Sequence, residues 1–267
     1  SDVVKRYLVD KQSGSMVVNM TIEDVTHYSP EQRAAIIAAY PEHEREARAK
    51  GVPMMGSGRV FPIIESAIKC EAFQIPSHWP RIVGIDFGVG HPAAMVWMAW
   101  DRDTDTLYVY DCWRESDRTA AEQALIYRPR GAWIPAAWPH DGLQRDKGSG
   151  IQLAKQYAAA GVAMLPERAT FEDGSNGLEA GVSEMLQRMQ SRRLRVFSHL
   201  NDWFEEFRMY HRKDGIIVPL MDDLLSATRY AMMMRRFAKT QSEAQGNPFA
   251  LILPSGMGRP IDDVIGY

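Results

Sequence analysis

The stretch RIVGIDFGVGHPAAMVWMAW, residues 81–100, constrains the fold most, because it holds two apolar runs around a glycine-rich turn. Apolar runs of this length, bounded by turn residues, predict two buried strands. Asp86 lies inside the first run. A carboxylate that is buried without a partner is strongly destabilising, so Asp86 is either hydrogen-bonded within the fold or a ligand for a cation.

The rest of the chain predicts an α/β fold with a mixed sheet. Strands are expected at 81–87, 93–100 and 106–113, followed by helices that alternate with further strands. Upstream, Ser29 and Gln32 form a capping box for a helix. We therefore expect a linker and extension over 1–80, one domain over 81–240 and a flexible tail over 241–267, which is rich in Gly, Pro and polar residues.

The composition excludes several classes of protein. The 267 residues are 45% hydrophobic and 24% charged, with a net charge of −3, and they show no signal peptide and no apolar run long enough to span a membrane. Two cysteines form neither a disulfide framework nor a metal motif, so a reducing, cytoplasmic setting fits best. The small net charge does not decide whether nucleic acid is a partner, because local patches count more.

Three further acids stand where predicted elements begin or end. Asp141 follows the strand predicted at 132–139, and Asp222 and Asp223 open the last predicted helix. Ligands of open α/β sheets collect at the carboxyl ends of strands. Asp223 shares a helix face with the small residue Ala227, which lets the helix approach the sheet. We expect Asp223 to reach the strand acids, whereas Asp222 lies about 100° round the helix and mainly caps it.

Carboxylates that converge on one point repel one another unless cations lie between them. Oxygen ligands suit Mg²⁺ or Mn²⁺, and two such ions are a known arrangement for hydrolysing phosphodiesters. Taken singly, each acid has a simpler explanation as a hydrogen-bonded strand residue, a turn or a cap. Their order along the chain favours a shared site, with Asp86, Asp141 and Asp223 as ligands and Asp222 as an alternate.

Basic residues follow the second acid and also occur on later elements. Arg145 and Lys147 lie in the loop directly after Asp141. Such charges are most often a solvated surface, but beside a metal site they can hold DNA phosphates without reading bases. The other candidates for DNA contact are Arg192, Arg193, Arg212 and Lys213.

These residues together resemble the C-terminal nuclease part of the large terminase subunit of tailed bacteriophages. GIDFG is similar to the first catalytic strand of that family, PHDG to the segment with the second acid, and MDDLLSATRYA to the segment with the third. The preceding segment, from SPEQRAAIIAAY to GSGRVFP, resembles the part that follows the motor domain. At Met221 the sequence departs from many relatives, which have His there.

The resemblance implies an RNase H-like fold and a two-metal endonuclease in which Asp86 bridges both ions. It also implies concatemeric viral double-stranded DNA as the substrate, cut with little base specificity. The small terminase subunit and the portal are the expected partners, the host cytoplasm is the expected location, and the chain is expected to be a fragment of a longer protein. No G-x-x-x-x-G-K-[ST] motif occurs, so we expect no P-loop ATPase activity.

Two alternatives stay open at this stage. GIDFGVG also resembles the phosphate loop of actin-like and sugar-kinase ATPases, whose glycines hold phosphate through backbone N–H groups. The other alternative is a non-catalytic DNA-binding or docking module whose acids are structural. Metal-dependent nicking of DNA distinguishes the nuclease from both.

Phosphate contacts without base contacts predict DNA binding that is indifferent to sequence and strongly weakened by salt. Replacing Arg145 and Lys147 together with alanine should weaken binding to all duplexes alike, and should reduce the slope of log affinity against log salt by about 2. Fluorescence anisotropy with two unrelated labelled duplexes at several salt concentrations measures both effects. A loss of affinity confined to one of the two duplexes would contradict the prediction.

Overall fold

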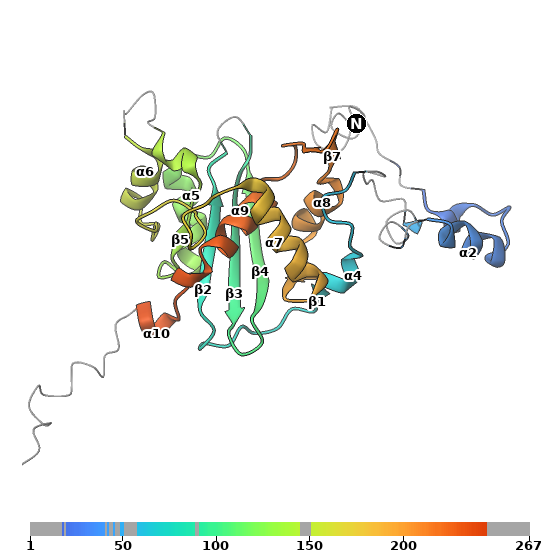
Figure 1. Ribbon diagram of the computed structural model, residues 1–267, viewed down its shortest axis with the longest axis horizontal. Coiled ribbons are helices and arrows are strands. Elements are labelled where there is room, and N and C mark those ends of the chain that lie inside the picture. Colours follow the sequence, from blue (N-terminus) through green and yellow to red (C-terminus); the bar gives the residue numbers. More distant parts are fainter. Residues whose placement is uncertain are drawn as a thin grey trace, which may run out of the picture.

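The computed structural model describes residues 18, 20–40, 42, 45, 49–50, 58–88, 91–144 and 151–244. A mixed six-stranded sheet lies at its centre (Figure 1), with the strand order β1-β6-β4-β3-β2-β5. The strands are β1 (Lys69–Cys70), β2 (Arg81–Asp86), β3 (Ala93–Asp101), β4 (Thr106–Glu115), β5 (Ala136–Ala137) and β6 (Leu194–Phe197).

The pairing confirms the predicted mixed sheet. The consecutive strands β2, β3 and β4 are antiparallel, whereas β5 pairs in parallel with β2 and β6 pairs in parallel with β4. A separate hairpin is formed by β7 (Arg212–Lys213) and β8 (Ile216–Ile217). Because β2 and β5 run in the same direction, their carboxyl ends lie at one edge of the sheet.

Helices flank the sheet and connect its strands. They are α2 (Pro30–Ala38), α4 (Glu65–Ile68), α5 (Ala120–Tyr127), α6 (Leu153–Ala159), α7 (Leu178–Gln190), α8 (Asn201–Met209), α9 (Asp223–Met233) and α10 (Gln241–Ala244), with short 3₁₀ turns η2 (Ile22–Asp24), η3 (Arg128–Arg130), η4 (His140–Leu143) and η5 (Arg235–Phe237). In the part of the chain that the structure describes, no helix is both long and apolar enough to cross a membrane.

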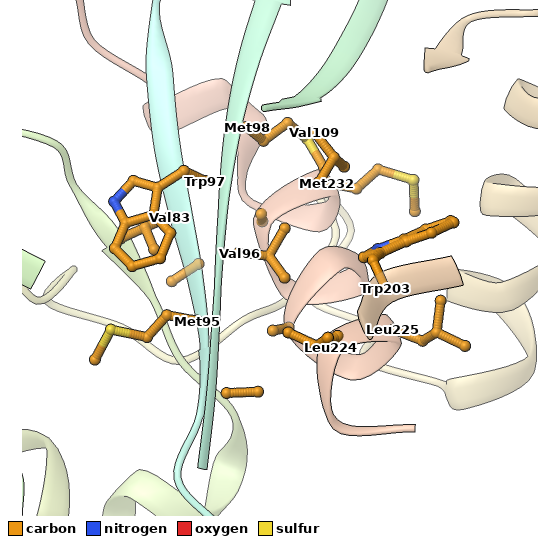
Figure 2. Packing of buried hydrophobic residues seen from close by; sticks show 14 of the residues in the cluster. Val83, Met95, Val96, Trp97, Met98, Val109, Trp203, Leu224, Leu225 and Met232 are labelled. Atoms are coloured by element: carbon orange, nitrogen blue, oxygen red, sulfur yellow. The ribbon is translucent and has the colours of Figure 1, made fainter. Parts of the chain in front are cut away.

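The core occupies both faces of the sheet. Figure 2 shows Met95 and Trp97 on one side of β3 and Val96 and Met98 on the other, as the two-residue period of a strand requires. All four side chains are buried. The second side is covered by α9, which contacts β2, β3 and β4.

Helix α9 lies directly on β2 because Gly84 has no side chain. A Cβ built on Gly84 would lie 1.8 Å from the carbonyl oxygen of Ala227 and 3.0 Å from the backbone nitrogen of Ala231. Both alanines are fully buried. This contact confirms the expectation that small residues let the last helix approach the sheet, and it sets the height of the first turn of α9 above the end of β2.

Residues just before the predicted boundary at residue 80 also pack on this core. Strand β1 pairs with β6, and the buried ring of Phe61 stacks on Phe207 with the ring centroids 5.9 Å apart. The division into 1–80, 81–240 and 241–267 stays a prediction. The described segment from residue 58 onward nevertheless does not lie apart from the sheet.

Several local predictions are resolved by the structure. Ser29 caps α2 and forms the predicted capping box with Gln32. The strand predicted over 132–139 shrinks to β5, because Pro135 and Pro139 flank it and have no N–H to donate to a strand ladder. The hairpin predicted over 1–20 and most of the predicted tail lie outside the described residues.

Gly84→Ala tests the contact between α9 and β2. The variant should lower the free energy of unfolding by at least about 1–3 kcal/mol, because the added methyl group meets backbone atoms that cannot turn away. Urea unfolding followed by circular dichroism measures the change. Gly177→Ala is the matched control, since its added Cβ would meet only the Ala180 Cβ at 3.8 Å. Equal losses in the two variants would contradict the prediction.

Candidate functional site

A cavity of about 620 Å³ opens where β2 and β5 end and α9 begins. The parallel pairing of β2 with β5 brings the residues that follow both strands to the same edge of the sheet. The α9 helix approaches this edge across Gly84. The lining of the cavity includes all four acids predicted from the sequence: Asp86, Asp141, Asp222 and Asp223.

Asp86 is the last residue of β2 and pairs in register with Ala94 of β3. Burial raises the pKa of the Asp86 carboxyl to about 7. His91 opposes that rise, and the negative charges of Asp223 and Asp222 add to it. The Asp86 carboxyl therefore shares the cavity with neighbouring acids, and His91 and the backbone of Gly88 offset the rise only in part.

Asp223 is the most buried of the four acids, with 6% of the residue exposed. The His91 Nδ1 lies 2.7 Å from Asp223 Oδ1 and 3.1 Å from the carbonyl oxygen of Pro92. Both neighbours are acceptors, so a proton on Nδ1 fits this position. Burial raises the pKa of Asp223, and His91 opposes the rise.

His91 is a site residue that was not predicted from the sequence. It lies five residues after Asp86, in the turn between β2 and β3. The sequence signal that could have identified it is an imidazole only five residues after a strand acid.

Asp222 occupies the N-cap position of α9, but its side chain makes no capping hydrogen bond. The expectation that Asp222 mainly caps the helix is therefore wrong. The amides of Leu224 and Leu225 instead donate to Glu206 Oε2, at 2.7 and 3.2 Å. The Asp222 side chain lines the cavity, where burial raises its pKa to about 6 and the charge of Asp223 adds to the rise.

Asp141 lies in η4, just after β5, and is exposed. The Gln144 Nε2 donates to Asp141 Oδ1 at 3.2 Å. The backbone of this turn is closed by a hydrogen bond from Gly142 N to Pro139 O. Asp141 is thus part of a turn, which was the simplest explanation of Asp141-Gly142 in the sequence. It also lines the cavity.

Arg114, near the end of β4, is a second lining residue that the sequence analysis missed. Its Nη1 donates to Glu206 Oε1 at 2.6 Å. It brings a positive charge close to the acids and opposes the rise in the pKa of Asp223. No feature of the sequence around Arg114 signals this role, because the partner Glu206 is 92 residues away along the chain.

Of the predicted DNA-binding residues that the structure describes, none lines this cavity. Arg145 and Lys147 lie outside the described residues, so their role stays a prediction. Arg212 of β7 is paired with Glu179, with Nη2 and Oε2 2.5 Å apart. Lys213, beside it, is exposed.

Arg192 and Arg193 lie far from the acids. They directly precede β6, whose first residues pair with the start of β4, whereas Asp86 lies level with the end of β4. The Arg193 Nη1 is 3.0 Å from Asp105 Oδ2. The two arginines are therefore at the opposite end of the sheet, and their contact with DNA stays a prediction that this site does not support.

The chemistry of the four carboxylates fits a hard divalent cation. Like charges in one cavity repel one another, and a cation between them removes the repulsion. Among the described residues, however, no three His, Cys, Asp or Glu side chains form a group that could hold a metal ion as they stand. The carboxylates would therefore have to turn toward one another to share an ion.

Two families match the sequence. The family described as terminase RNaseH-like domain matches residues 83–235, which is more than half of the chain. The family described as terminase large subunit, T4likevirus-type, N-terminal matches residues 1–68. The first match contains every acid of the cavity.

Two phage proteins are similar over most of the chain. The chain is 50% identical to the large terminase subunit of Salmonella phage P22 over 240 residues. This match covers 90% of the chain and 48% of the phage P22 protein. The large terminase subunit of Enterobacteria phage LP7 is also 50% identical, over 236 residues that cover 88% of this chain and 50% of that protein. The chain thus spans about half the length of these relatives.

Solved structures agree with the sequence matches. The nuclease domain of the P22 large terminase is 46% identical with a TM-score of 0.67, and the match covers 71% of this chain and 98% of that one. The large terminase of a thermophilic bacteriophage shares the fold at 13% identity, with a TM-score of 0.53 and coverage of 81% of this chain and 55% of that one.

Asp222→Ala tests whether this residue caps α9. Because its side chain makes no capping bond, the metal-free variant should differ from wild type by less than about 0.5 kcal/mol in the free energy of unfolding. Thr119→Ala is the control, because Thr119 does cap α5, and it should cost about 1 kcal/mol. Urea unfolding in the presence of EDTA measures both. Equal losses would restore Asp222 as the cap.

Proposed function

Because the chain belongs to the family of terminase RNaseH-like domains, we propose that it is a metal-dependent endonuclease that hydrolyses double-stranded DNA. The observation that carries the proposal is the convergence of Asp86, Asp141, Asp222 and Asp223 on one cavity at the carboxyl edge of the sheet. Such an edge is where α/β folds bind their ligands. Four carboxylates that outnumber the basic side chains lining the same cavity are suited to Mg²⁺ or Mn²⁺.

The proposed ligands follow from where each acid lies. Asp86 lines the same cavity as Asp222 and Asp223, and the charges of both raise its pKa. We assign Asp86, Asp141 and Asp223 as the residues that would hold two divalent ions, with Asp222 as an alternate ligand. When bound, such a pair of ions activates a water molecule for attack and stabilises the leaving oxygen of the phosphodiester.

The chain's own cationic and polar groups prepare this cavity. His91 holds the Asp223 carboxylate by a hydrogen bond, which fixes the orientation of one proposed ligand. Arg114 lines the same cavity and keeps a positive charge beside the acids. Its side chain is 18% exposed, so a phosphate oxygen of the substrate can reach it.

The wider biological role rests on family membership alone. We propose concatemeric viral DNA as the substrate, cut with little base specificity during genome packaging in the host cytoplasm. The small terminase subunit and the portal are the proposed partners. The chain spans about half the length of the two phage relatives. The roles proposed here are therefore those of proteins about twice its length.

The alternatives from the sequence have less support. The actin-like and sugar-kinase ATPases have a duplicated core, whereas the described residues contain one six-stranded sheet and one small hairpin. A purely structural role for the acids would require each to have a partner. Asp86 and Asp222 instead have raised pKa values of about 7 and about 6, to which neighbouring acids contribute.

The first test of the proposal is metal dependence. The chain should nick supercoiled plasmid DNA with Mn²⁺ or Mg²⁺ and should stop when EDTA is added in excess. Asp86→Asn should lower the nicking rate by about 100-fold or more, since even residues that only orient metal ligands cost 10–100-fold. Its melting temperature in EDTA should equal or exceed that of wild type, because one of several clustered charges is removed.

Two outcomes would overturn the proposal. Nicking that continues undiminished in excess EDTA would exclude the metal mechanism. Full activity of Asp86→Asn would place the catalytic centre elsewhere in the chain. Lys155→Ala, on the exposed side of α6, is the control for nonspecific effects of a charge change and should nick at the wild-type rate.

A further inference from the structure

A buried carboxylate lies beneath the first turn of α9, outside the cavity. Glu206 of α8 is fully buried, and both of its oxygens accept hydrogen bonds. Oε1 accepts from Arg114 Nη1 at 2.6 Å, and Oε2 accepts from the amides of Leu224 at 2.7 Å and Leu225 at 3.2 Å. Burial raises the pKa of Glu206 and the charge of Asp223 adds to the rise, whereas Arg114 and the amide of Leu225 oppose it.

These contacts make Glu206 the cap of α9. The amides that it accepts belong to the second and third residues of the helix, which a side chain at the N-cap position normally satisfies. Asp222 occupies that position and is a residue type that caps well, yet its side chain does not do so. A residue from another helix has taken over a role that the local sequence could fill.

An ion pair with a fully buried carboxylate has an unfavourable desolvation energy. Desolvation of Glu206 and Arg114 offsets much of their attraction, so stability alone does not explain the arrangement. The chain also reaches α9 through Met221 at a φ of 53°, a conformation that is unfavourable for a residue other than glycine and persists only where the surroundings enforce it. The entry to the helix is therefore tightly constrained at the point where two of the cavity acids lie.

We propose that Glu206, held by Arg114, is a positioning residue for the acid cluster: it caps α9 in place of Asp222 and so leaves the Asp222 carboxylate, together with Asp223, to the cavity. This inference rests on the proposed metal-dependent function for its purpose. The structural part of the inference is that Glu206, and not Asp222, caps α9. This part is independent of the proposed function and can be tested without metal.

The metal-free test is a double-mutant cycle between Glu206→Gln and Asp222→Ala. The glutamine has one carbonyl oxygen, and the charged Arg114 forms the stronger hydrogen bond with it. The glutamine N–H₂ group then faces the helix amides and leaves them without an acceptor, so Asp222 should turn back and cap α9 in this variant. Asp222→Ala should then raise the unfolding equilibrium constant about fivefold in the Glu206→Gln background, but hardly at all in wild type. Urea unfolding in EDTA measures the four proteins.

The metal-dependent test uses Mn²⁺ binding by isothermal titration calorimetry and Mn²⁺-dependent nicking. Glu206→Gln should weaken Mn²⁺ binding by about tenfold or more, and excess Mn²⁺ should restore most of the nicking rate. Glu205→Gln is the matched control. It removes the neighbouring carboxylate, which lies 3.6 Å from Arg114 and touches no helix amide, so its Mn²⁺ affinity should equal that of wild type.

If Glu206→Gln does not fold, Arg114→Met with Glu206→Met removes both charges of the pair at similar volume and enters the same cycle. Additive effects in the cycle would overturn the proposal, and so would unchanged Mn²⁺ affinity in folded Glu206→Gln. A wild-type chain that neither binds Mn²⁺ nor nicks DNA would instead overturn the proposed function. The cycle would still decide whether Glu206 has replaced Asp222 as the cap.

Discussion

The close contact between α9 and β2 is the constraint on which the site depends. Gly84 brings the backbone of Ala227 against the strand, at a distance that no other residue type permits. Because a strand and a helix are each rigid, this one contact determines where the first turn of α9 lies relative to the end of β2. Asp86 and Asp223 belong to those two ends, so the packing of an apolar interface sets the position of polar groups.

Acidic and basic groups lie next to one another at the cavity that this contact positions. The acids of the cavity face His91 and Arg114, and Arg114 in turn faces the buried Glu206. Each cation reduces the repulsion that the acids would otherwise exert on one another. The same groups hold the acids in defined orientations by hydrogen bonds, which is what a binding site for a compact charged ligand requires.

The sequence was sufficient for much of this architecture. The apolar runs around Asp86 predicted β2 and β3, and the small residues of the last helix predicted its close approach to the sheet. It was insufficient wherever a role depends on a distant partner. Asp222 looked like a cap because residues of its type cap helices, and only the fold places Glu206 where it takes the amides first.

The sequence by itself determined the class of fold and the identity of the four acids, because apolar periodicity and the placement of acids at the ends of elements are local properties. Only the tertiary structure decided which groups surround those acids. His91, Arg114 and Glu206 meet the start of α9 from three separate elements, and the charge and hydrogen bonding of a buried site are set by whichever groups the fold brings together.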